Sequence, residues 1–275
     1  MRVILVPVAD RPECAKALST AFELGHRLGA SISGCHIRPH RDSNLYLSSD
    51  FAAAAWKKKG TRSAPAAANT LYRKVAERNG YELIRRPRVA PGALWSEKVG
   101  SPDKIMGIVG PVADMIVVSR PKRPDGVATL FLNAALMETS RPVLLLPQAG
   151  RRKVGRRICI GWDQSPGAAR AVASAMPLLQ LADEVSIVTC GPEDQPGPKA
   201  TQLAAYLAHW GVKAERLQTR GRHIEPELMD ACQETKADLL VTGAYSRFRW
   251  YQKVLGGTTE FLVHKARIPV LMQHR

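Results

Sequence analysis

Hydrophobic residues gather in short, nearly continuous runs, and each run is followed by a longer stretch with the spacing of an amphipathic helix. The first run spans Val3–Asp10 and leads into the Ala-rich stretch Ala15–Leu28. Continuous apolar runs are typical of strands buried on both faces, and strands that alternate with helices favour a parallel sheet with helices on either side. The pattern therefore predicts an α/β fold.

The order of these runs occurs twice along the chain. Strand-like runs at 3–10, 30–37, 81–84, 113–118 and 141–146 correspond to runs at 157–163, 184–190, 212–217, 237–242 and 268–272. Helical stretches at 66–78 and 199–210 both stop at a glycine, Gly80 or Gly211, which is a common C-terminal signal. Such repetition indicates one supersecondary unit used in tandem. We expect two Rossmann-like units, each a five-stranded parallel sheet flanked by helices.

The repeat also sets the expected domain boundaries. The first unit covers residues 1–148 and the second covers 155–275, with a basic linker at 148–156. Residues 39–65 have no counterpart in the second half and are interpreted as a surface insertion, helical around Phe51–Lys58. The fifth strand of each unit is apolar, and as a sheet edge it would need a partner for its backbone groups. Pairing of the two edges would make a pseudo-two-fold dimer within one chain, and a homodimer is a further arrangement that such an edge allows.

The charge balance is strongly basic, with 40 Lys and Arg against 24 Asp and Glu and a formal net charge of +16. Such a surface attracts polyanions, including nucleic acid, nucleotides and anionic lipid. The basic residues are scattered, however, and no zinc-finger spacing or RNA-binding signature accompanies them. A solvated surface is the favoured interpretation, and nucleic-acid binding is a weaker hypothesis that filter binding across a salt series would test.

The cysteines and the N-terminal residues bear on location. The five cysteines are odd in number and widely spaced, with no Cys-x-x-Cys pair. This favours a reducing compartment, with no disulfide framework and no structural zinc. The chain reads from Met1 straight into a strand, and no apolar run approaches the length of a membrane span. We expect a cytoplasmic protein with no membrane segment.

Candidate ligand-binding residues lie at the ends of the predicted strands of the second half. Open parallel sheets bind ligands beyond the C-terminal ends of their strands, near the switch in strand order. Four segments should converge there. They are Gly161 and Asp163 at the end of the first strand, Thr189 at the end of the second, Gly243 at the end of the fourth, and Gly256-Gly257-Thr258-Thr259 at the start of the last helix.

The Gly-Gly-Thr-Thr step carries the chemistry of an anion site. It offers free backbone N–H groups, two hydroxyls and the positive end of a helix dipole. Arg247, Arg249 and Lys253 precede it and add positive charge. Gly243, at a strand end, lets the backbone approach a ligand closely. The segment is not a Walker A loop, because no Gly-Lys-Ser/Thr follows.

The second half resembles the universal stress protein family, whose nucleotide-binding members carry Gly-x2-Gly-x9-Gly-Ser/Thr. Gly243 fills the first position, and nine residues separate Ser246 from Gly256, as in that pattern. Ser246 stands where the second glycine is expected, and Gly257 stands where Ser or Thr is expected, with Thr258 and Thr259 next. The resemblance covers nearly all of residues 155–275 and, more loosely, the first half. It implies the adenine nucleotide alpha hydrolase-like type of Rossmann-like fold.

The resemblance implies a cytosolic stress-response or signalling protein that binds ATP or another adenine nucleotide, with Mg²⁺, and that acts with a regulatory protein partner. It implies no enzyme activity beyond slow ATP hydrolysis. Residues 256–259 would hold the phosphates, and Gly243 and Asp163 the sugar and base. If the position of Ser246 needs a positive φ, serine costs about 1 kcal/mol there, whereas its hydroxyl could instead donate to a phosphate.

Simpler roles stay open for the same residues. Asp163 could cap the following helix, since Asp-x-Ser is an N-cap pattern, and Gly256-Gly257 could be a tight turn. Trp162 is interpreted as a core residue rather than a stacking surface. Two other functions also stay open. One is a partner-binding stress protein with no bound ATP, and the other is an adenylate-forming enzyme, which needs a phosphate loop after the first strand.

The first half departs further from the motif. After its fourth strand it reads Ser119-Arg120-Pro121-Lys122-Arg123-Pro124-Asp125-Gly126, and prolines remove backbone donors. Asp10 is retained at the end of the first strand, but no phosphate loop follows the fourth. We therefore expect one nucleotide site per chain, in the second half.

Overall fold

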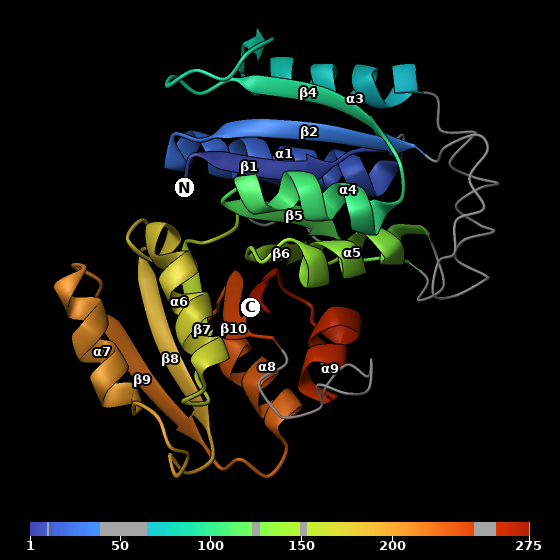
Figure 1. The fold of residues 1–275 in the computed structure, drawn as a ribbon. Helices are drawn as coiled ribbons and strands as arrows, with labels where there is room; N and C mark the ends of the chain where they lie inside the picture. Colours follow the sequence, from blue (N-terminus) through green and yellow to red (C-terminus); the bar gives the residue numbers. More distant parts are fainter. Residues whose placement is uncertain (10, 39–64, 123–126, 149–152, 245–256, 275) are drawn as a thin grey trace. The chain divides into compact units, whose positions relative to one another are not determined.

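The computed structural model describes residues 1–9, 11–38, 65–122, 127–148, 153–244 and 257–274. The chain divides into two compact units, Met1–Gln148 and Ala149–Arg275 (Figure 1). The helix expected around Phe51–Lys58 lies outside the described residues. Of the expected insertion, the described part is Pro65, which begins a helix.

The first unit is an α/β sheet whose described strands all pair in parallel (Figure 1). The strand order is β3-β4-β2-β1-β5-β6. Its elements are β1 (Val3–Pro7), α1 (Pro12–Leu28), β2 (Ser31–Arg38), α3 (Pro65–Arg78), β3 (Leu83–Ile84), β4 (Ala93–Val99), α4 (Pro102–Val109), the 3₁₀ turn η1 (Gly110–Val112), β5 (Met115–Ser119), α5 (Val127–Glu138) and β6 (Val143–Leu146).

The prediction of five strands is wrong for the first unit, where the described residues form six. The run expected at 81–84 shortens to β3, which pairs only with β4. The strand that lies beside β2 is β4, paired from Ala93 with Ile32 to Val99 with Arg38. β4 carries Ser96, Glu97 and Lys98 and is exposed over its last residues, so it lacks the continuous apolar run that marks a central strand.

The second unit has five strands in its described residues, all parallel, in the order β11-β10-β7-β8-β9. The order switches direction at β7, which lies between β8 and β10. The elements are β7 (Arg157–Gly161), α6 (Pro166–Leu179), β8 (Glu184–Cys190), α7 (Ala200–His209), β9 (Ala214–Thr219), α8 (Ile224–Glu234), β10 (Leu239–Gly243), α9 (Gly257–Lys265) and β11 (Val270–Gln273).

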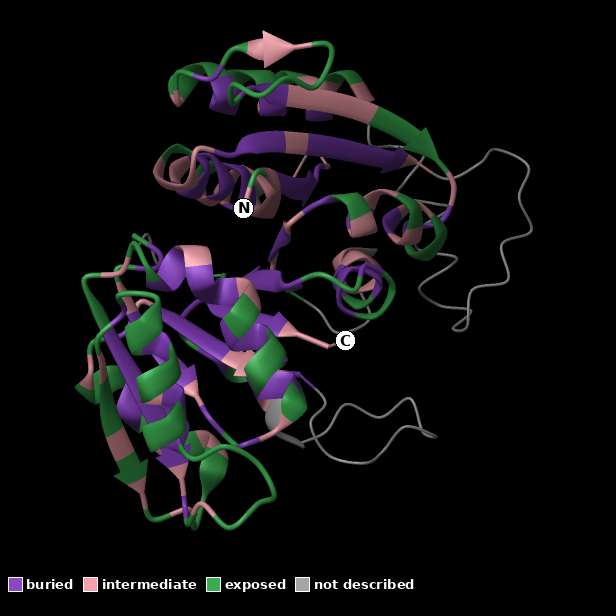
Figure 2. Cartoon of the chain, turned by 60° about the vertical axis from the view of Figure 1, so that its left-hand side comes forward, coloured by how far each residue is buried: buried purple, intermediate pink, exposed green. Residues whose placement is uncertain are grey.

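The core of each unit lies on its central strands. Figure 2 shows these strands buried and the outer sides of the helices exposed. In β7, Ile158, Cys159 and Ile160 are buried, and in α6 the buried positions recur on the face that packs against β10 and β11. An apolar run buried on both faces is what the continuous pattern predicts. The α/β class expected from the sequence is confirmed.

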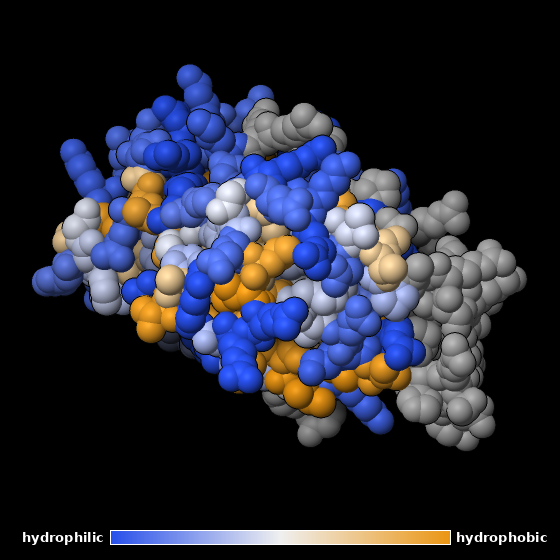
Figure 3. Space-filling model, turned by 90° about the horizontal axis from the view of Figure 1, so that it is seen from above, coloured by the Kyte–Doolittle hydropathy of each residue, from blue (hydrophilic) through white to orange (hydrophobic). Residues whose placement is uncertain are grey.

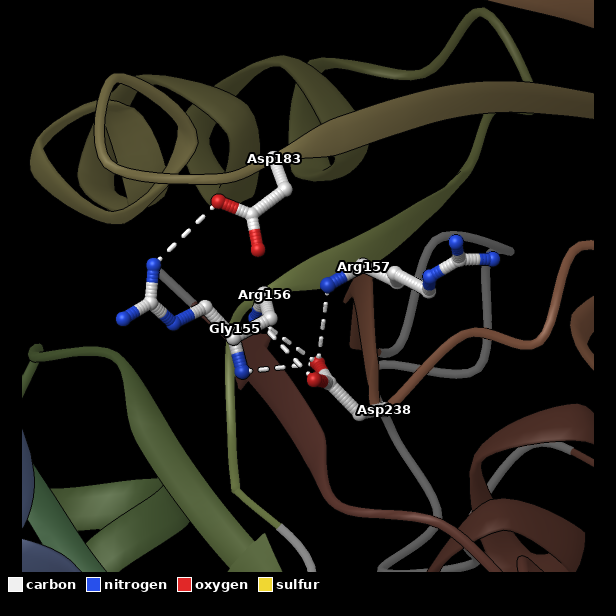
Figure 4. A network of polar contacts seen from close by, with 5 residues as sticks. All are labelled: Gly155, Arg156, Arg157, Asp183 and Asp238. Carbon is white, nitrogen blue, oxygen red and sulfur yellow. Dashed lines mark hydrogen bonds and ion pairs between the residues drawn. The ribbon is translucent and has the colours of Figure 1, made fainter.

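A carboxylate holds the start of the first strand in the second unit. Asp238, just before β10, accepts hydrogen bonds from the backbone N–H groups of Gly155, Arg156 and Arg157 at 2.8, 3.0 and 3.2 Å (Figure 4). Arg156 also pairs with Asp183 at 3.2 Å. The last residues of the expected linker therefore belong to the second unit.

The first unit repeats this arrangement. Asp114, just before β5, accepts hydrogen bonds from the N–H groups of Arg2 and Val3. Partial burial raises the pKa of Asp114, but these two N–H groups, together with the positive charges of the N-terminus and Arg141, lower the pKa overall. The matching Ala-Asp pairs in the two halves thus mark the N-terminal edge of each sheet, opposite the edge where ligands bind.

Other sequence signals have visible counterparts. Gly80 and Gly211 follow their helices at φ of 67° and 74°, the left-handed conformation that glycine adopts freely. All five cysteines are free.

The face of the first unit that carries β3, β4 and α3 is dominated by hydrophilic residues, with small apolar groups between them (Figure 3). None of the helices in the described part of the chain has the length and apolar character of a membrane span.

Candidate functional site

Three of the predicted site residues lie together at the C-terminal edge of the second sheet. Gly161 pairs with Thr242 of β10 on one side and with Val188 of β8 on the other. Gly243 and Thr189 are each one residue further along, so they flank the end of β7. The edge is also where the strand order switches, which is the usual ligand position in an open parallel sheet.

Gly243 has a packing role that sequence reasoning missed. A Cβ at this position would lie 2.6 Å from the backbone nitrogen of Ala168 and 2.7 Å from the carbonyl carbon of Gly167. The first turn of α6 therefore fills the space that a side chain would take. Gly161 is different, since its nearest neighbours for a Cβ, Leu228 and Thr242, are 3.5 Å away. A glycine is thus required at the end of β10 and not at the end of β7.

In the loop from β7 to α6, the helix cap and the candidate ligand contact are two different residues, although the sequence allowed both roles for Asp163. Ser165 is the N-cap of α6, and its hydroxyl accepts the N–H of Ala168 at 3.1 Å. Asp163 lies two residues earlier and accepts the N–H of Ser165 at 3.1 Å. The cap therefore falls on Ser165 rather than on Asp163. Asp163 is exposed at the strand end, with its carboxylate oriented by this local turn.

Gln164 is a site residue that sequence reasoning missed. Its φ is 61°, uncommon for a residue with a side chain, and only 5% of it is exposed. Its amide nitrogen donates to the carbonyl oxygen of Gly197 at 3.0 Å, and its amide oxygen accepts the N–H of Gln195 at 3.2 Å. Glutamine has no local preference for this conformation, so the contact carries no sequence signal.

Trp162 is buried, as predicted for a core residue, with 5% of its surface exposed. Its indole N–H donates to the carbonyl oxygen of Pro198 at 2.8 Å. Thr189, in β8, is also 5% exposed. Both residues lie beneath the surface of the edge, so Asp163 is the exposed polar group at the end of β7.

The predicted phosphate segment is described in part. Gly257, Thr258 and Thr259 form the first turn of α9, where backbone N–H groups are free of intrahelical partners. Glu260 follows them in the same turn and is exposed. Ser246 and Gly256 lie outside the described residues, as do Arg247, Arg249 and Lys253.

The corresponding edge of the first unit is built differently. Ile4 pairs with Met115 as Ile158 pairs with Leu239, which places Ser119 at the position of Gly243. The Ser119 hydroxyl donates to the carbonyl oxygen of Glu13 at 2.8 Å, within the first turn of α1. A side chain thus links the strand to the helix where the second unit has direct backbone contact. The residue of the first unit that corresponds to Asp163 in the repeat, Asp10, lies outside the described residues.

Two basic side chains, one buried and one half-buried, lie at this edge of the first unit. Arg120, directly after β5, is 8% exposed, and burial lowers its pKa. Burial also lowers the pKa of Lys16, with a further contribution from the charge of Arg120. The Lys16 ammonium donates to the carbonyl oxygen of Pro147. A bulky cationic group, Arg120, therefore stands where the second unit has Ala244.

No cluster of three or more His, Cys, Asp and Glu side chains suited to a metal ion occurs within the described ranges. Mg²⁺ bound with a nucleotide takes most of its ligands from phosphates and water, and needs only one or two protein groups.

The two units define a tandem α/β protein of the Rossmann-like class, with one glycine-lined edge. Residues 155–274 match the model of the Universal stress protein family. A comparison with curated proteins finds no match.

Solved structures share the fold of the whole chain. A universal stress protein from Archaeoglobus fulgidus DSM 4304 is 14% identical with a TM-score of 0.72, covering 99% of this chain and 98% of that chain. A functionally unknown protein from Pseudomonas aeruginosa PAO1 is 15% identical with a TM-score of 0.59, covering 100% and 92%. Because both similarities extend over nearly the full length, the tandem arrangement of the chain fits that of known structures.

Proposed function

We propose that the second unit binds an adenine nucleotide, ATP with Mg²⁺, and that the chain is a cytosolic stress-response or signalling protein whose state depends on that nucleotide. The observation that carries the proposal is the meeting of Gly161, Thr189 and Gly243 at the switch point of the second sheet. Parallel sheets bind nucleotides at this position. The match of residues 155–274 to the universal stress protein family supports the same site.

The described residues suggest how the ligand is divided between elements. The first turn of α9 offers N–H groups and the positive end of a helix dipole, which suit the phosphates. Asp163 is exposed at the end of β7. Because Ser165 caps α6, the carboxylate of Asp163 is not needed as the helix cap. Asp163 can therefore accept a hydrogen bond from the sugar or base. Mg²⁺, when bound, would neutralise the phosphate charge.

We further propose that ATP hydrolysis is at most slow. Hydrolysis needs a base or a positioned group that activates water near the phosphates. Among the described residues of this edge, Asp163 belongs to the nucleobase end of the proposed site and not to the phosphate end, and Thr189 is buried. Neither residue is therefore proposed as the group that activates water. The nucleotide would thus serve as a signal whose presence changes the surface offered to a regulatory protein.

An adenylate-forming enzyme is disfavoured by the loop after β7. Such an enzyme needs free backbone N–H groups there to hold phosphates. The N–H of Ala168 is bonded to Ser165, and the backbone of Gly243 lies against Gly167 and Ala168. These contacts take up a donor and the space that a phosphate group would need in this loop.

Association of the chain is a separate proposal. β6 and β11 each lie at the end of the strand order of their own unit and are apolar. An apolar end strand favours pairing with another strand, either within the chain as a pseudo-dimer or in a homodimer. Light scattering of the purified chain distinguishes the monomer from the homodimer.

The test of nucleotide binding is the analysis of the ligand that co-purifies with the chain. We expect mass spectrometry of the denatured protein to detect an adenine nucleotide, and calorimetry with Mg-ATP to show saturable binding. Asp163→Ala should weaken that binding, whereas Asp183→Ala, at the opposite edge of the sheet, should not. Absence of released nucleotide together with absence of heat at millimolar Mg-ATP would favour a partner-binding protein without ATP.

A further inference from the structure

The loop between β8 and α7, residues 191–199, touches both neighbours of Asp163. Trp162, before Asp163, donates its indole N–H to Pro198 at 2.8 Å. Gln164, after Asp163, exchanges hydrogen bonds with Gly197 and Gln195 at 3.0 and 3.2 Å. The same loop begins just after Thr189, the other predicted site residue at this end. The β8–α7 loop thus connects two strand ends of the proposed site.

The contact between Gln164 and this loop leaves no space for a larger residue. A Cβ on Gly197 would lie 2.1 Å from the backbone oxygen of Gln164 and 3.0 Å from its carbonyl carbon. Both are backbone atoms, so they cannot turn aside as a flexible side chain would. The residue in this contact, Gln164, has a backbone φ of 61°. The loop therefore contacts the residues on both sides of Asp163, the side chain of Trp162 and both the backbone and the side chain of Gln164.

The loop is itself held in place at its first residue. The N–H of Gly191 donates to the carbonyl oxygen of Thr219 at 3.2 Å, and the Gln218 amide donates to the carbonyl oxygen of Gly191 at 2.9 Å. Gly191 adopts a φ of 90°, and Gly221 lies so close that a Cβ on it would be 2.4 Å from the Cα of Gly191. The prolines at positions 192, 196 and 198 restrict the remaining backbone. The β8–α7 loop is thus preorganised before any ligand binds.

We propose that the β8–α7 loop sets the base selectivity of the nucleotide site, through Gln164 and Gly197, by fixing Asp163 and limiting the space beside it. This inference rests on the proposed function. The loop contacts the residues around Asp163, at the base end, whereas α9 is the element proposed for the phosphates. Gln164 and Gly197 are positioning residues, since they act on the ligand through Asp163. Their loss should therefore affect recognition of the purine and spare recognition of the phosphates.

The experiment compares two variants of the full chain with a matched control. Gly197→Ala forces the loop away from Gln164, and Gln164→Gly removes the amide while leaving a residue that adopts φ of 61° freely. The control is Gly211→Ala, where φ is 74° and no atom lies within 4 Å of the added Cβ. It strains the backbone after α7 without touching the loop. Each protein competes ATP, GTP and inorganic tripolyphosphate against ribose-labelled ATP in the presence of Mg²⁺.

In both loop variants we expect affinity for ATP to fall about tenfold and the preference for ATP over GTP to shrink. Affinity for tripolyphosphate should stay within about twofold of the wild-type value, a difference of about 0.4 kcal/mol. The control should keep all three affinities. Because Gln164→Gly introduces no clash, it gives a result even if Gly197→Ala does not fold.

Unchanged ATP affinity in Gln164→Gly would overturn the inference, as would equal losses for ATP and tripolyphosphate. Either result leaves the proposed function standing, because the wild-type chain still binds ATP. A wild-type chain that binds none of the three ligands would instead overturn the proposed function, and the inference with it.

Discussion

Gly243 packs against the first turn of α6, and we expect Gly243→Ala to destabilise the second unit even without nucleotide. The added Cβ would lie 2.6 Å from Ala168 N and 2.7 Å from Gly167 C, where real Cβ atoms essentially never come closer than 3.0 Å. Both neighbours are backbone atoms, so relief requires α6 to shift relative to β10. Overpacking of this kind costs about 1–3 kcal/mol, and backbone neighbours favour the upper part of that range.

The assay is urea unfolding of the ligand-free chain, followed by hydrogen exchange of peptides from β7 and β10. A loss of about 2–3 kcal/mol corresponds to a fall in Tm of about 8–12 °C for a unit of this size. Gly161→Ala is the matched control on the neighbouring strand. Its Cβ would meet its nearest neighbours at 3.5 Å, so we expect a change of at most about 0.5 kcal/mol. Equal stability of Gly243→Ala and the wild type would refute the packing argument and leave ligand approach as the role of Gly243.

Three further predictions concern carboxylates of the second unit. Asp238→Ala removes the acceptor of three N–H groups at the start of β7. Urea titration should show that the free energy of unfolding falls by about 1–3 kcal/mol. An unchanged midpoint would contradict the stabilising role of the network in Figure 4. The Thr219 hydroxyl and the backbone N–H groups of the three residues just before α8 lower the pKa of Glu227 from 4.5 to about 2. The stabilisation by Glu227 is therefore present above pH 4.5 and lost as the pH falls towards 2. Glu227→Gln should therefore flatten the acid limb of stability against pH, and an unchanged limb counts against this. Glu260→Gln removes a negative charge from the first turn of α9 and should raise ATP affinity about twofold in a calorimetric titration, whereas a fall would place the phosphates elsewhere.

The sequence predicts the fold well wherever strands are apolar on both faces. The run Glu184–Cys190 becomes β8 with the same bounds, and the match between Ala113-Asp114 and Ala237-Asp238 marks the same edge in both sheets. Strand β4 of the first unit escapes prediction, because it is only half-buried in its first part and then exposes charged residues in place of an apolar run. Its place beside β2 depends on pairing between residues distant in sequence.

The candidate site is predictable only in its outline. Parallel register brings the ends of neighbouring strands together, so Gly161, Thr189 and Gly243 could be placed at one edge from the strand pattern. Their local roles could not be read in the same way. The close approach of Gly243 to α6 and the left-handed backbone of Gln164 arise from tertiary contacts, and neither residue type signals them.

The most direct test of the account is the stoichiometry of nucleotide binding to the full chain. In isothermal titration with Mg-ATP, the account predicts one nucleotide per chain, with affinity reduced by Asp163→Ala in the second unit. The buried Arg120 and the Ser119–Glu13 contact at the matching edge of the first unit predict no second site. Two nucleotides per chain, or none, would contradict nucleotide binding by the second unit alone.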